Sequence, residues 1–352
     1  MKKAGKTALG VVGGAAVLFA ALTGLTALIM KGQFGRGEYP GDRSSEHTAF
    51  GWYPAYEAEY PRTEVEFPSG DLMLKGWIYG AENTDKLIVF AHGIGSGHEA
   101  YVNQLLWFVD QGWCVFAYDA AGSGDSPGNS TVGLVQSALD LDSALSFAEQ
   151  DSRLKHMPKV LLGHSWGGFA VGGVLNFDHD VKAVVSLSGY ADPLEMLDQG
   201  AVNVLGKTGA KLFQPFSHLY HRFVFGKNAH LNAVDGINKA NIPFLAVHGE
   251  QDGFVLYSLG IISQQDNITD PCFETYTISG DFSHHNDYFH SEECNRRMYE
   301  LFPDHSYSQE EMLAIAGASS KYDSDAEKKL FRAVNEPLLE RIQAFYQRAL
   351  TE

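Results

Sequence analysis

The sequence predicts an α/β protein in which a mostly parallel central sheet is flanked by helices. From about residue 60, short apolar runs alternate with segments of helical spacing. Strands that are buried on both faces are continuous apolar runs, and parallel neighbours need a crossover helix between them. The 352 residues, 45% of them hydrophobic, are enough to bury a sizeable core.

Eight segments have the composition of strands. The first two flank Ser69-Gly70-Asp71 and predict a hairpin, and the other six are predicted to be further strands, five of them continuous or nearly continuous apolar runs. In chain order, the segments are Glu64–Phe67, Leu72–Tyr79, Leu87–Ala91, Cys114–Tyr118, Val160–Leu162, Ala183–Ser188, Phe244–Val247 and Phe273–Ile278.

Helical spacing occupies several of the intervals between these strands. It covers Tyr101–Asp110, Val132–Glu149 and Phe169–Leu175. From about 190 to 242 strand character is missing, which predicts a helical cap inserted over the strand ends. The cap is rich in aromatic residues near 212–225. These residues are expected to form an apolar wall for a substrate, to pack on the core, or both. Further helices are expected at about 291–352.

Charge and cysteine content limit the function classes and partners. The formal net charge of -17 opposes binding to phosphate backbones, so we expect no nucleic-acid partner. Cys114 lies in an apolar run and is predicted to be buried. Cys272 and Cys294 could pair if the domain is exported, but the sequence does not decide whether they lie close together. No C-x-x-C motif is present, and no metal or other cofactor is expected.

The N-terminus has the pattern of a membrane segment. Ala8–Met30 is free of charge, and its 23 residues would span about 34 Å as a helix. We therefore predict a single-pass anchor at 1–31, a tether at 32–58 and a domain at 59–352. Lysines before the apolar stretch favour an extracytoplasmic domain, and the alternative is a signal segment that is cleaved to release a secreted protein.

A serine lies in the turn after one predicted strand. Val160–Leu162 leads directly into Gly163-His164-Ser165-Trp166-Gly167, and a further glycine follows. This G-x-S-x-G pattern is typical of a nucleophile elbow, in which small flanking residues allow a strained turn that exposes the serine hydroxyl. The pentapeptide alone is weak evidence, because it can arise by chance in a glycine-rich chain.

An acid and a histidine follow later strands in the order that such a serine requires. Asp252 lies in the loop after Phe244–Val247, and the pair His284-His285 lies in the loop after Phe273–Ile278. The sequence does not fix which of the two histidines is the catalytic base, because the register of the loop is open. The Asn-Asp pair that follows favours His285. A carboxylate would hold the imidazole in the tautomer that accepts the serine proton. The candidate triad is therefore Ser165, Asp252 and His285.

Two backbone N–H groups are expected to form an oxyanion hole. One belongs to Trp166, directly after the serine at a helix N-terminus, and the other to Ile94, after His92-Gly93. His92 and His164 stand next to these motifs and are predicted to shape the loops by hydrogen bonding. A metal cluster of His284, His285 and nearby residues is the alternative for this region, but no H-E-x-x-H spacing accompanies it.

Four ordered motifs give the chain its resemblance to serine hydrolases of the α/β-hydrolase fold. They are the His92–Gly95 loop, the D-x-x-G-x-G-x-S turn at 119–126, the elbow at 163–168 and the acid loop at 249–252. The chain is most similar to the subgroup of monoglyceride lipases and serine aminopeptidase-like proteins. It departs from the family at Ala120-Ala121, where relatives often carry an aromatic residue or Arg after the aspartate.

The resemblance implies a serine hydrolase that cleaves a carboxylic ester, thioester or amide through an acyl-enzyme. Its substrate would be a small molecule or acyl compound, lipid-derived compounds included. A peptidase or an acyltransferase would use the same triad. A hydrolase-fold protein that binds without catalysis is the alternative from another class.

Overall fold

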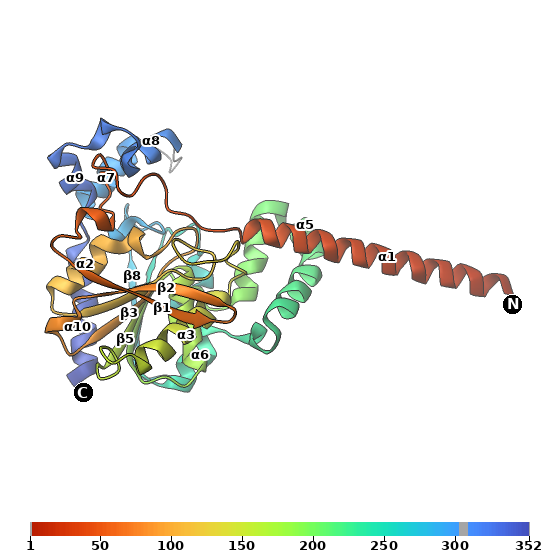
Figure 1. Ribbon diagram of the computed structural model, residues 1–352. Helices are drawn as coiled ribbons and strands as arrows, with labels where there is room; N and C mark the ends of the chain where they lie inside the picture. Colours follow the sequence, from red (N-terminus) through yellow and green to blue (C-terminus); the bar gives the residue numbers. More distant parts are fainter. Residues whose placement is uncertain (1, 303–308, 352) are drawn as a thin grey trace.

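The computed structural model describes residues 2–302 and 309–351, apart from the side chains at 2–16, 18, 83 and 309. Its centre is an eight-stranded sheet in the order β1-β2-β4-β3-β5-β6-β7-β8 (Figure 1). The strands are β1 (Arg62–Ser69), β2 (Leu72–Tyr79), β3 (Leu87–Ala91), β4 (Cys114–Tyr118), β5 (Lys159–His164), β6 (Val181–Leu187), β7 (Phe244–Gly249) and β8 (Phe273–Ile278).

Strand direction agrees with the sequence pattern. The hairpin β1–β2 and the pair β2–β4 are antiparallel, and every later pair is parallel. Each of the eight predicted segments corresponds to one strand, so the predicted fold class is confirmed. Parallel strands place their carboxyl ends at one edge of the sheet, where ligands bind in such folds.

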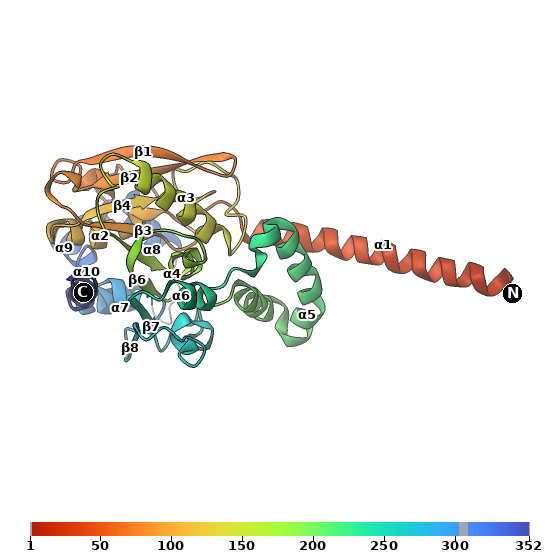
Figure 2. The ribbon, with the colours of Figure 1, turned by 90° about the horizontal axis from the view of Figure 1, so that it is seen from below.

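Helices cover both faces of the sheet (Figures 1 and 2). On one face lie α2 (Val102–Asp110) and α10 (Glu336–Thr351), whose buried residues share an apolar cluster with the sheet. The other face carries α3 (Gln136–Gln150), α4 (Trp166–Gly173) and α6 (Ala233–Ala240), which contribute to a second cluster.

The predicted cap is the helical insertion between β6 and β7. It consists of α5 (Pro193–Phe225), a 3₁₀ turn at Gly226–His230 and α6. Gly206 has φ 66° and ψ 170°, and this non-helical residue separates α5 into the two arms visible in Figure 2. The aromatic stretch is only partly packed, since Phe223 is 87% exposed.

The N-terminal helix corrects the predicted localisation. The helix α1 (Lys2–Gln33) extends away from the sheet in Figure 1, and its inner end lies against α5. In the part of the chain that the structure describes, no helix is long and apolar enough to cross a bilayer, so the predicted single-pass anchor and extracytoplasmic localisation are wrong. The prediction assumed that the whole charge-free stretch faces lipid. In the structure, Thr26 and Met30 are buried, and Phe19 contacts Phe216 of α5. The side chains of 8–16 lie outside the described residues.

The segment predicted as a tether is held against the domain. Arg36 donates to the carbonyl oxygens of Ser126 and Gly128 at 2.8 Å. Farther along, the Tyr39 hydroxyl donates to the buried carboxylate of Asp119 at 3.0 Å. These contacts fix residues 36–39 beside the turn that follows β4.

The C-terminal tail contains several helices. It contains α7 (Glu292–Leu301), α8 (Gln309–Leu313), a π-helical turn at Ala314–Ala318, α9 (Asp325–Phe331) and α10. Buried residues of α7 to α9 form a small apolar cluster that also includes Ala49 of the N-terminal segment. Residues around Ala49 therefore pack against the helices that follow β8.

Candidate active site

Ser165 lies in a strained turn between β5 and α4. Its φ of 57° and ψ of -112° are uncommon for a residue with a side chain. The neighbouring glycines permit the turn, because a Cβ on Gly167 would collide with the carbonyl oxygen of Ala91, and a Cβ on Gly168 would lie 2.7 Å from the Cα of Gly189. This geometry is the one expected of a nucleophile elbow.

Asp252 and His285 meet at the same edge of the sheet. Asp252 follows β7, His285 follows β8, and His285 Nδ1 lies 2.7 Å from Asp252 Oδ2. The other carboxylate oxygen accepts from the backbone N–H groups of Phe254 and Val255, both at 2.9 Å. With both oxygens occupied, the carboxylate has one orientation toward the imidazole.

The electrostatic surroundings keep Asp252 ionised. Burial raises the pKa of its carboxyl group, but the hydrogen bond and charge of His285 and the hydroxyl of Ser188 outweigh burial, so that the pKa falls to about 2. Asp252 is therefore a carboxylate at neutral pH and acts as an acceptor toward His285 Nδ1–H. This leaves Nε2 as the nitrogen with a free lone pair.

Two further residues orient the acid and were missed by the sequence analysis. The Ser188 hydroxyl donates to Asp252 Oδ2 at 2.7 Å, and the Tyr288 hydroxyl donates to Ser188 Oγ. Ser188 has φ 48°, so the chain turns sharply as it leaves β6. The sequence signal that could have pointed to Ser188 is its position at the end of a predicted buried strand, because such a residue lies at the carboxyl edge of the sheet.

The two adjacent histidines have different partners. His284 Nδ1 lies 3.1 Å from Asp287 Oδ2 and 3.1 Å from the Tyr299 hydroxyl, whereas His285 bonds to Asp252. The structure thus brings His285 to the acid of the candidate triad, and it places His284 in a separate polar group with Asp287.

The two predicted oxyanion donors have N–H groups without acceptors. Trp166 is the first residue of α4, so it has no intrahelical acceptor for its N–H. No described residue accepts from the backbone N–H of Trp166 or from that of Ile94, whereas the indole Nε1–H of Trp166 donates to the carbonyl oxygen of Leu134 at 3.0 Å. A Cβ on Gly93 would lie 3.5 Å from Ser165 Cβ, so the chain directly before Ile94 adjoins the serine.

A chain of hydrogen bonds connects the elbow, the oxyanion loop and the histidine loop. The Gly93 N–H donates to the Tyr101 hydroxyl at 3.1 Å, and that hydroxyl lies 2.8 Å from His164 Nδ1. On its other side, His164 Nε2 lies 3.1 Å from the carbonyl oxygen of His285. Burial, with the nearby His285, lowers the pKa of His164 well below its ordinary value. A neutral His164 that carries its proton on Nε2 satisfies all of these partners.

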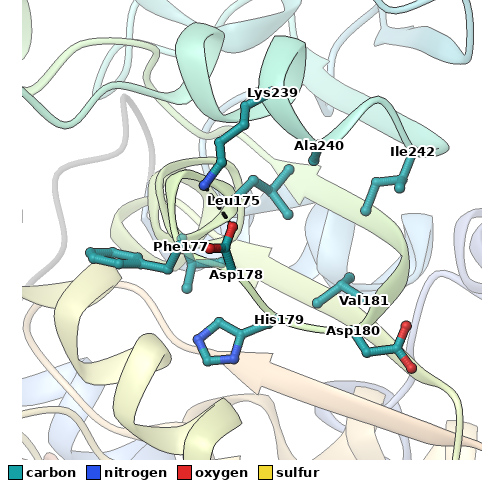
Figure 3. A pocket seen from close by; sticks show the side chains of 10 residues that line it. Leu175, Phe177, Asp178, His179, Asp180, Val181, Lys239, Ala240 and Ile242 are labelled. Atoms are coloured by element: carbon teal, nitrogen blue, oxygen red, sulfur yellow. Dashed lines mark hydrogen bonds and ion pairs between the residues drawn. The ribbon is translucent and has the colours of Figure 1, made fainter.

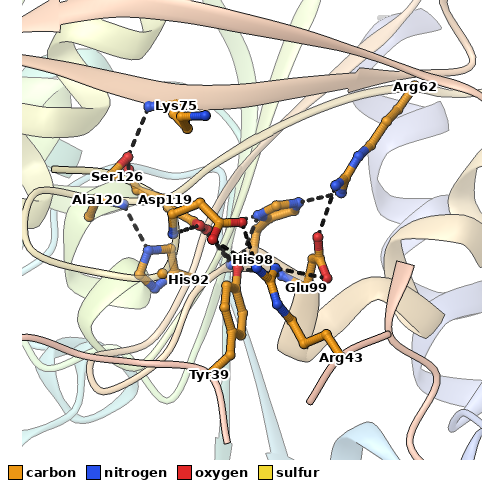
Figure 4. Close-up of polar contacts among 12 residues, drawn as sticks. Tyr39, Arg43, Arg62, Lys75, His92, His98, Glu99, Asp119, Ala120 and Ser126 are labelled. Carbon is orange, nitrogen blue, oxygen red and sulfur yellow. Dashed lines mark hydrogen bonds and ion pairs between the residues drawn. The ribbon is translucent and has the colours of Figure 1, made fainter. Parts of the chain in front are cut away.

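The turn after β4 is hydrogen-bonded to the oxyanion loop (Figure 4). His92 Nε2 accepts from the N–H of Ala120 at 2.9 Å, so His92 shapes its loop as predicted. Asp119 is fully buried and accepts from the N–H of His98 and of Asp125, both at 2.8 Å. Burial raises the pKa of Asp119, but His98 and these backbone donors lower it below its ordinary value. Asp119 is therefore a turn-forming residue.

Comparisons with known proteins agree with this architecture. Residues 82–218 match the serine aminopeptidase (S33) family. The chain is 27% identical over 211 residues to the protein YfhR of Escherichia coli K12, a match that covers 55% of this chain and 67% of that protein. The esterase Pf2001 of Pyrococcus furiosus has a TM-score of 0.57 at 17% identity and covers 89% of this chain and 96% of its own. The α/β hydrolase GrgF of Penicillium sp. sh18 has a TM-score of 0.53 at 18% identity, over 83% of this chain and all of its own.

This chain has the α/β-hydrolase fold. The fold and the family match support a serine hydrolase in general. In this hydrolase fold, Ser165, Asp252 and His285 follow β5, β7 and β8 at one edge of the sheet. The Ser165 hydroxyl makes no hydrogen bond to the other described residues; catalytic hydrogen bonds of hydrolases often tighten only when substrate is bound.

The metal alternative and the cysteines of the sequence analysis can also be placed in the structure. Across residues 2–302 and 309–351, no three His, Cys, Asp or Glu side chains are placed to hold a metal ion. The cysteines are free thiols, of which Cys114 and Cys294 are buried and Cys272 is exposed.

A surface pocket lies at the opposite edge of the sheet from the candidate site (Figure 3). It adjoins Val181, the first residue of β6, whereas the candidate triad follows strand ends. Its Lys239 pairs with Asp178 at 2.9 Å, and its His179 lies between Asp142 and Glu149. The charged side chains of this pocket are thus engaged in ion pairs with one another and with neighbouring residues.

Proposed function

We propose that this protein is a serine hydrolase that cleaves a carboxylic ester through an acyl-enzyme, with Ser165 as the nucleophile. The observation that carries the proposal is the 2.7 Å contact between His285 Nδ1 and Asp252 Oδ2, at the sheet edge where the strained Ser165 turn lies. Nucleophile, acid and base follow β5, β7 and β8, in the chain order typical of this fold.

The reaction begins with proton transfer from the serine. As the Ser165 oxygen attacks the substrate carbonyl, His285 Nε2 takes the hydroxyl proton, and Asp252 stabilises the imidazolium that forms. The negative charge on the carbonyl oxygen is met by the N–H groups of Ile94 and Trp166. His285 then returns the proton to the leaving alcohol, and water hydrolyses the acyl-enzyme by the same steps.

Esters are the favoured substrates, and peptides are the second candidate. The structurally similar Pf2001 is described as an esterase, and the cavity beside Ile94 has largely apolar walls. The match to serine aminopeptidases over 82–218 favours the peptidase alternative. A panel of p-nitrophenyl esters and aminoacyl p-nitroanilides separates the two, because only a peptidase would turn over the anilides at comparable kcat/KM.

A fluorophosphonate probe tests the proposal directly. The probe forms a covalent bond with an activated serine, so the folded wild-type protein is expected to gain one adduct, and peptide mapping by mass spectrometry is expected to place it on Ser165. Heat-unfolded protein is the control, since an unfolded serine is not activated. An unlabelled folded protein would favour the alternative of a non-catalytic binding protein.

Substitution of Asp252 with asparagine is expected to lower kcat about 10⁴-fold on p-nitrophenyl acetate. The amide group presents an N–H to His285, so the imidazole turns to the tautomer whose Nε2 cannot accept the serine proton. Initial rates measure the effect, and circular dichroism checks the fold.

Asp140→Asn is the matched control, because Asp140 is also fully buried but bonds to Ser69 Oγ and the N–H of Ala121. We expect its kcat to stay within about threefold of wild type. An equal loss of kcat in the two variants would show that activity depends on a buried carboxylate in general and not on the contact of Asp252 with His285.

A further inference from the structure

Residues 36–43, which we call the N-terminal brace, contact two loops beside the candidate site (Figure 4). One is the stretch 93–99, which contains the candidate oxyanion donor Ile94. The other is the turn at 119–126 that follows β4. The brace belongs to the stretch 32–58 that the sequence predicts to be a tether, yet its contacts tie it to both loops.

Backbone hydrogen bonds fix the brace on the turn after β4. The Gly37 N–H donates to the carbonyl oxygen of Gly122 at 2.8 Å, and the Gly124 N–H donates to the carbonyl oxygen of Gly37 at 2.9 Å. The bonds from Arg36 to carbonyl oxygens of the same turn add to this pairing. The brace therefore has a defined position from which it can support a neighbouring loop.

The other side of the brace packs directly against the oxyanion loop. A Cβ on Gly37 would lie 2.8 Å from the carbonyl carbon of Gly95 and 3.1 Å from its Cα. The two backbones thus meet with no side chain between them, and Gly37 is buried. Because Gly95 directly follows Ile94, this contact lies one residue away from the candidate oxyanion donor.

The oxyanion loop depends on such packing for its shape. The backbone groups of Ile94, Gly95 and Ser96 make no hydrogen bond to the other described residues. Gly95 has φ 102°, a conformation that glycine adopts readily and that leaves the chain free to move. An N–H group stabilises an oxyanion only when it already points at the developing charge, so the loop needs a neighbour that restricts it.

Two side chains of the brace connect the far end of this loop to the turn. The Tyr39 hydroxyl donates to the carboxylate of Asp119 at 3.0 Å and accepts from the N–H of Glu99 at 3.3 Å. Arg43 pairs with Glu99 at 3.1 Å and with Asp125 at 2.7 Å. The brace therefore holds the stretch 93–99 at both of its ends.

We propose that the N-terminal brace positions the Ile94 N–H for catalysis, with Gly37 and Tyr39 as its positioning residues. The inference rests on the proposed ester hydrolysis and assigns part of its machinery to a segment that precedes the family match at 82–218. Neither residue touches the substrate, and each acts through the loop that carries the donor. Changes in the brace should therefore alter kcat more than KM.

Gly37→Ala tests the packing contact. The added methyl group must displace Gly95, whereas the φ of Gly37 lies outside the positive region, so alanine brings no backbone strain of its own. On p-nitrophenyl acetate we expect kcat to fall about 100-fold, the loss typical of one oxyanion donor, with KM within about threefold of wild type. Initial rates over a range of substrate concentrations measure both constants.

Gly35→Ala is the matched control, because it makes the same substitution two residues earlier. A Cβ on Gly35 would lie 3.6 Å from the carbonyl oxygen of Gly32, which is an ordinary contact, and its φ is not positive either. We expect its kcat to stay within about twofold of wild type.

Tyr39→Phe tests the hydrogen-bonded contact, since it keeps the ring and removes the hydroxyl. We expect kcat to fall about tenfold with little change in KM. Tyr60→Phe is its control, because the Tyr60 hydroxyl also donates to both oxygens of a carboxylate at 3.0 Å, in this case Asp110 at the end of α2. The control should keep kcat within about twofold of wild type.

A transition-state analogue separates positioning from a general structural role. With 1,1,1-trifluoro-2-octanone, the Ser165 oxygen bonds to the ketone carbon, the hydroxyl proton passes to His285 Nε2, and the ketone oxygen becomes an oxyanion. Its affinity thus depends on the same donors as the rate. We expect the inhibition constant of this ketone to rise in Gly37→Ala and Tyr39→Phe by the factor by which kcat falls, with melting temperatures close to those of the controls.

The inference is overturned if kcat of Gly37→Ala and of Tyr39→Phe stays within about twofold of the controls. It is also overturned by a rise in KM alone, or by a fall in kcat with an unchanged inhibition constant. Should Gly37→Ala fail to fold, the same criteria applied to Tyr39→Phe decide. Each of these results leaves the proposed function intact when the wild type hydrolyses p-nitrophenyl acetate and reacts with the fluorophosphonate. A folded wild type that does neither would overturn the proposed function, and this inference with it.

Discussion

Replacement of Ser165 by alanine is expected to lower kcat about 10⁶-fold on p-nitrophenyl acetate and to abolish fluorophosphonate labelling. The variant lacks the oxygen that forms the acyl-enzyme, and only the oxyanion donors and substrate binding remain. The fold should persist, because alanine and serine both carry a Cβ and meet the same cost at φ 57°.

A second buried serine provides the control for this variant. Ser123 is fully buried, and its hydroxyl has no hydrogen-bond partner in the described residues, so Ser123→Ala removes an oxygen without breaking a bond. We expect its kcat to remain within about twofold of wild type. Turnover by Ser165→Ala at a rate close to that of Ser123→Ala would contradict the assignment of the nucleophile.

Replacement of His285 by alanine is expected to lower kcat by a similar factor of about 10⁶. Without the imidazole, the serine hydroxyl has no acceptor for its proton, and Asp252 is left with no base to orient. His284→Ala is the matched control, because His284 is the neighbouring imidazole and bonds to Asp287 instead of Asp252. Its kcat should stay within about tenfold of wild type, since only its polar contacts in the loop are lost.

Initial rates for both histidine variants decide which of the two histidines is the base. Melting temperatures check that both variants fold. Added imidazole is expected to restore part of the activity to His285→Ala, because it can diffuse into the vacated space and act as the base. A large loss in His284→Ala together with near-normal rates in His285→Ala would move the base to the other histidine.

The strand pattern could be read from the sequence because it depends on local composition. A parallel strand buried on both faces must be apolar at consecutive positions, so runs such as Leu87–Ala91 and Cys114–Tyr118 mark it without knowledge of its neighbours. The requirement for glycine at Gly163 is equally local, because a Cβ there would collide with the carbonyl oxygen of Gly167 in the same turn. Chain order then brought Asp252 and His285 to the expected loops.

The partners that orient the candidate site could not be read from the sequence. Ser188 reaches Asp252, and Tyr101 bridges Gly93 and His164, only because strands distant in the chain end side by side. Serine and tyrosine are common at many positions, so neither residue type signals such a contact by itself.

The N-terminus gives the clearest example of a feature that local composition does not decide. A charge-free stretch looks alike whether it faces lipid or protein, so composition predicted an anchor and a tether, whereas Met30 is buried and Tyr39 bonds to Asp119. By itself, the sequence determined the strands, the glycine-bounded serine turn and the order of the candidate triad, because local sterics and burial govern these features. Only the tertiary structure decided which histidine meets the acid and that Tyr39 meets Asp119, because such contacts depend on how distant segments pack.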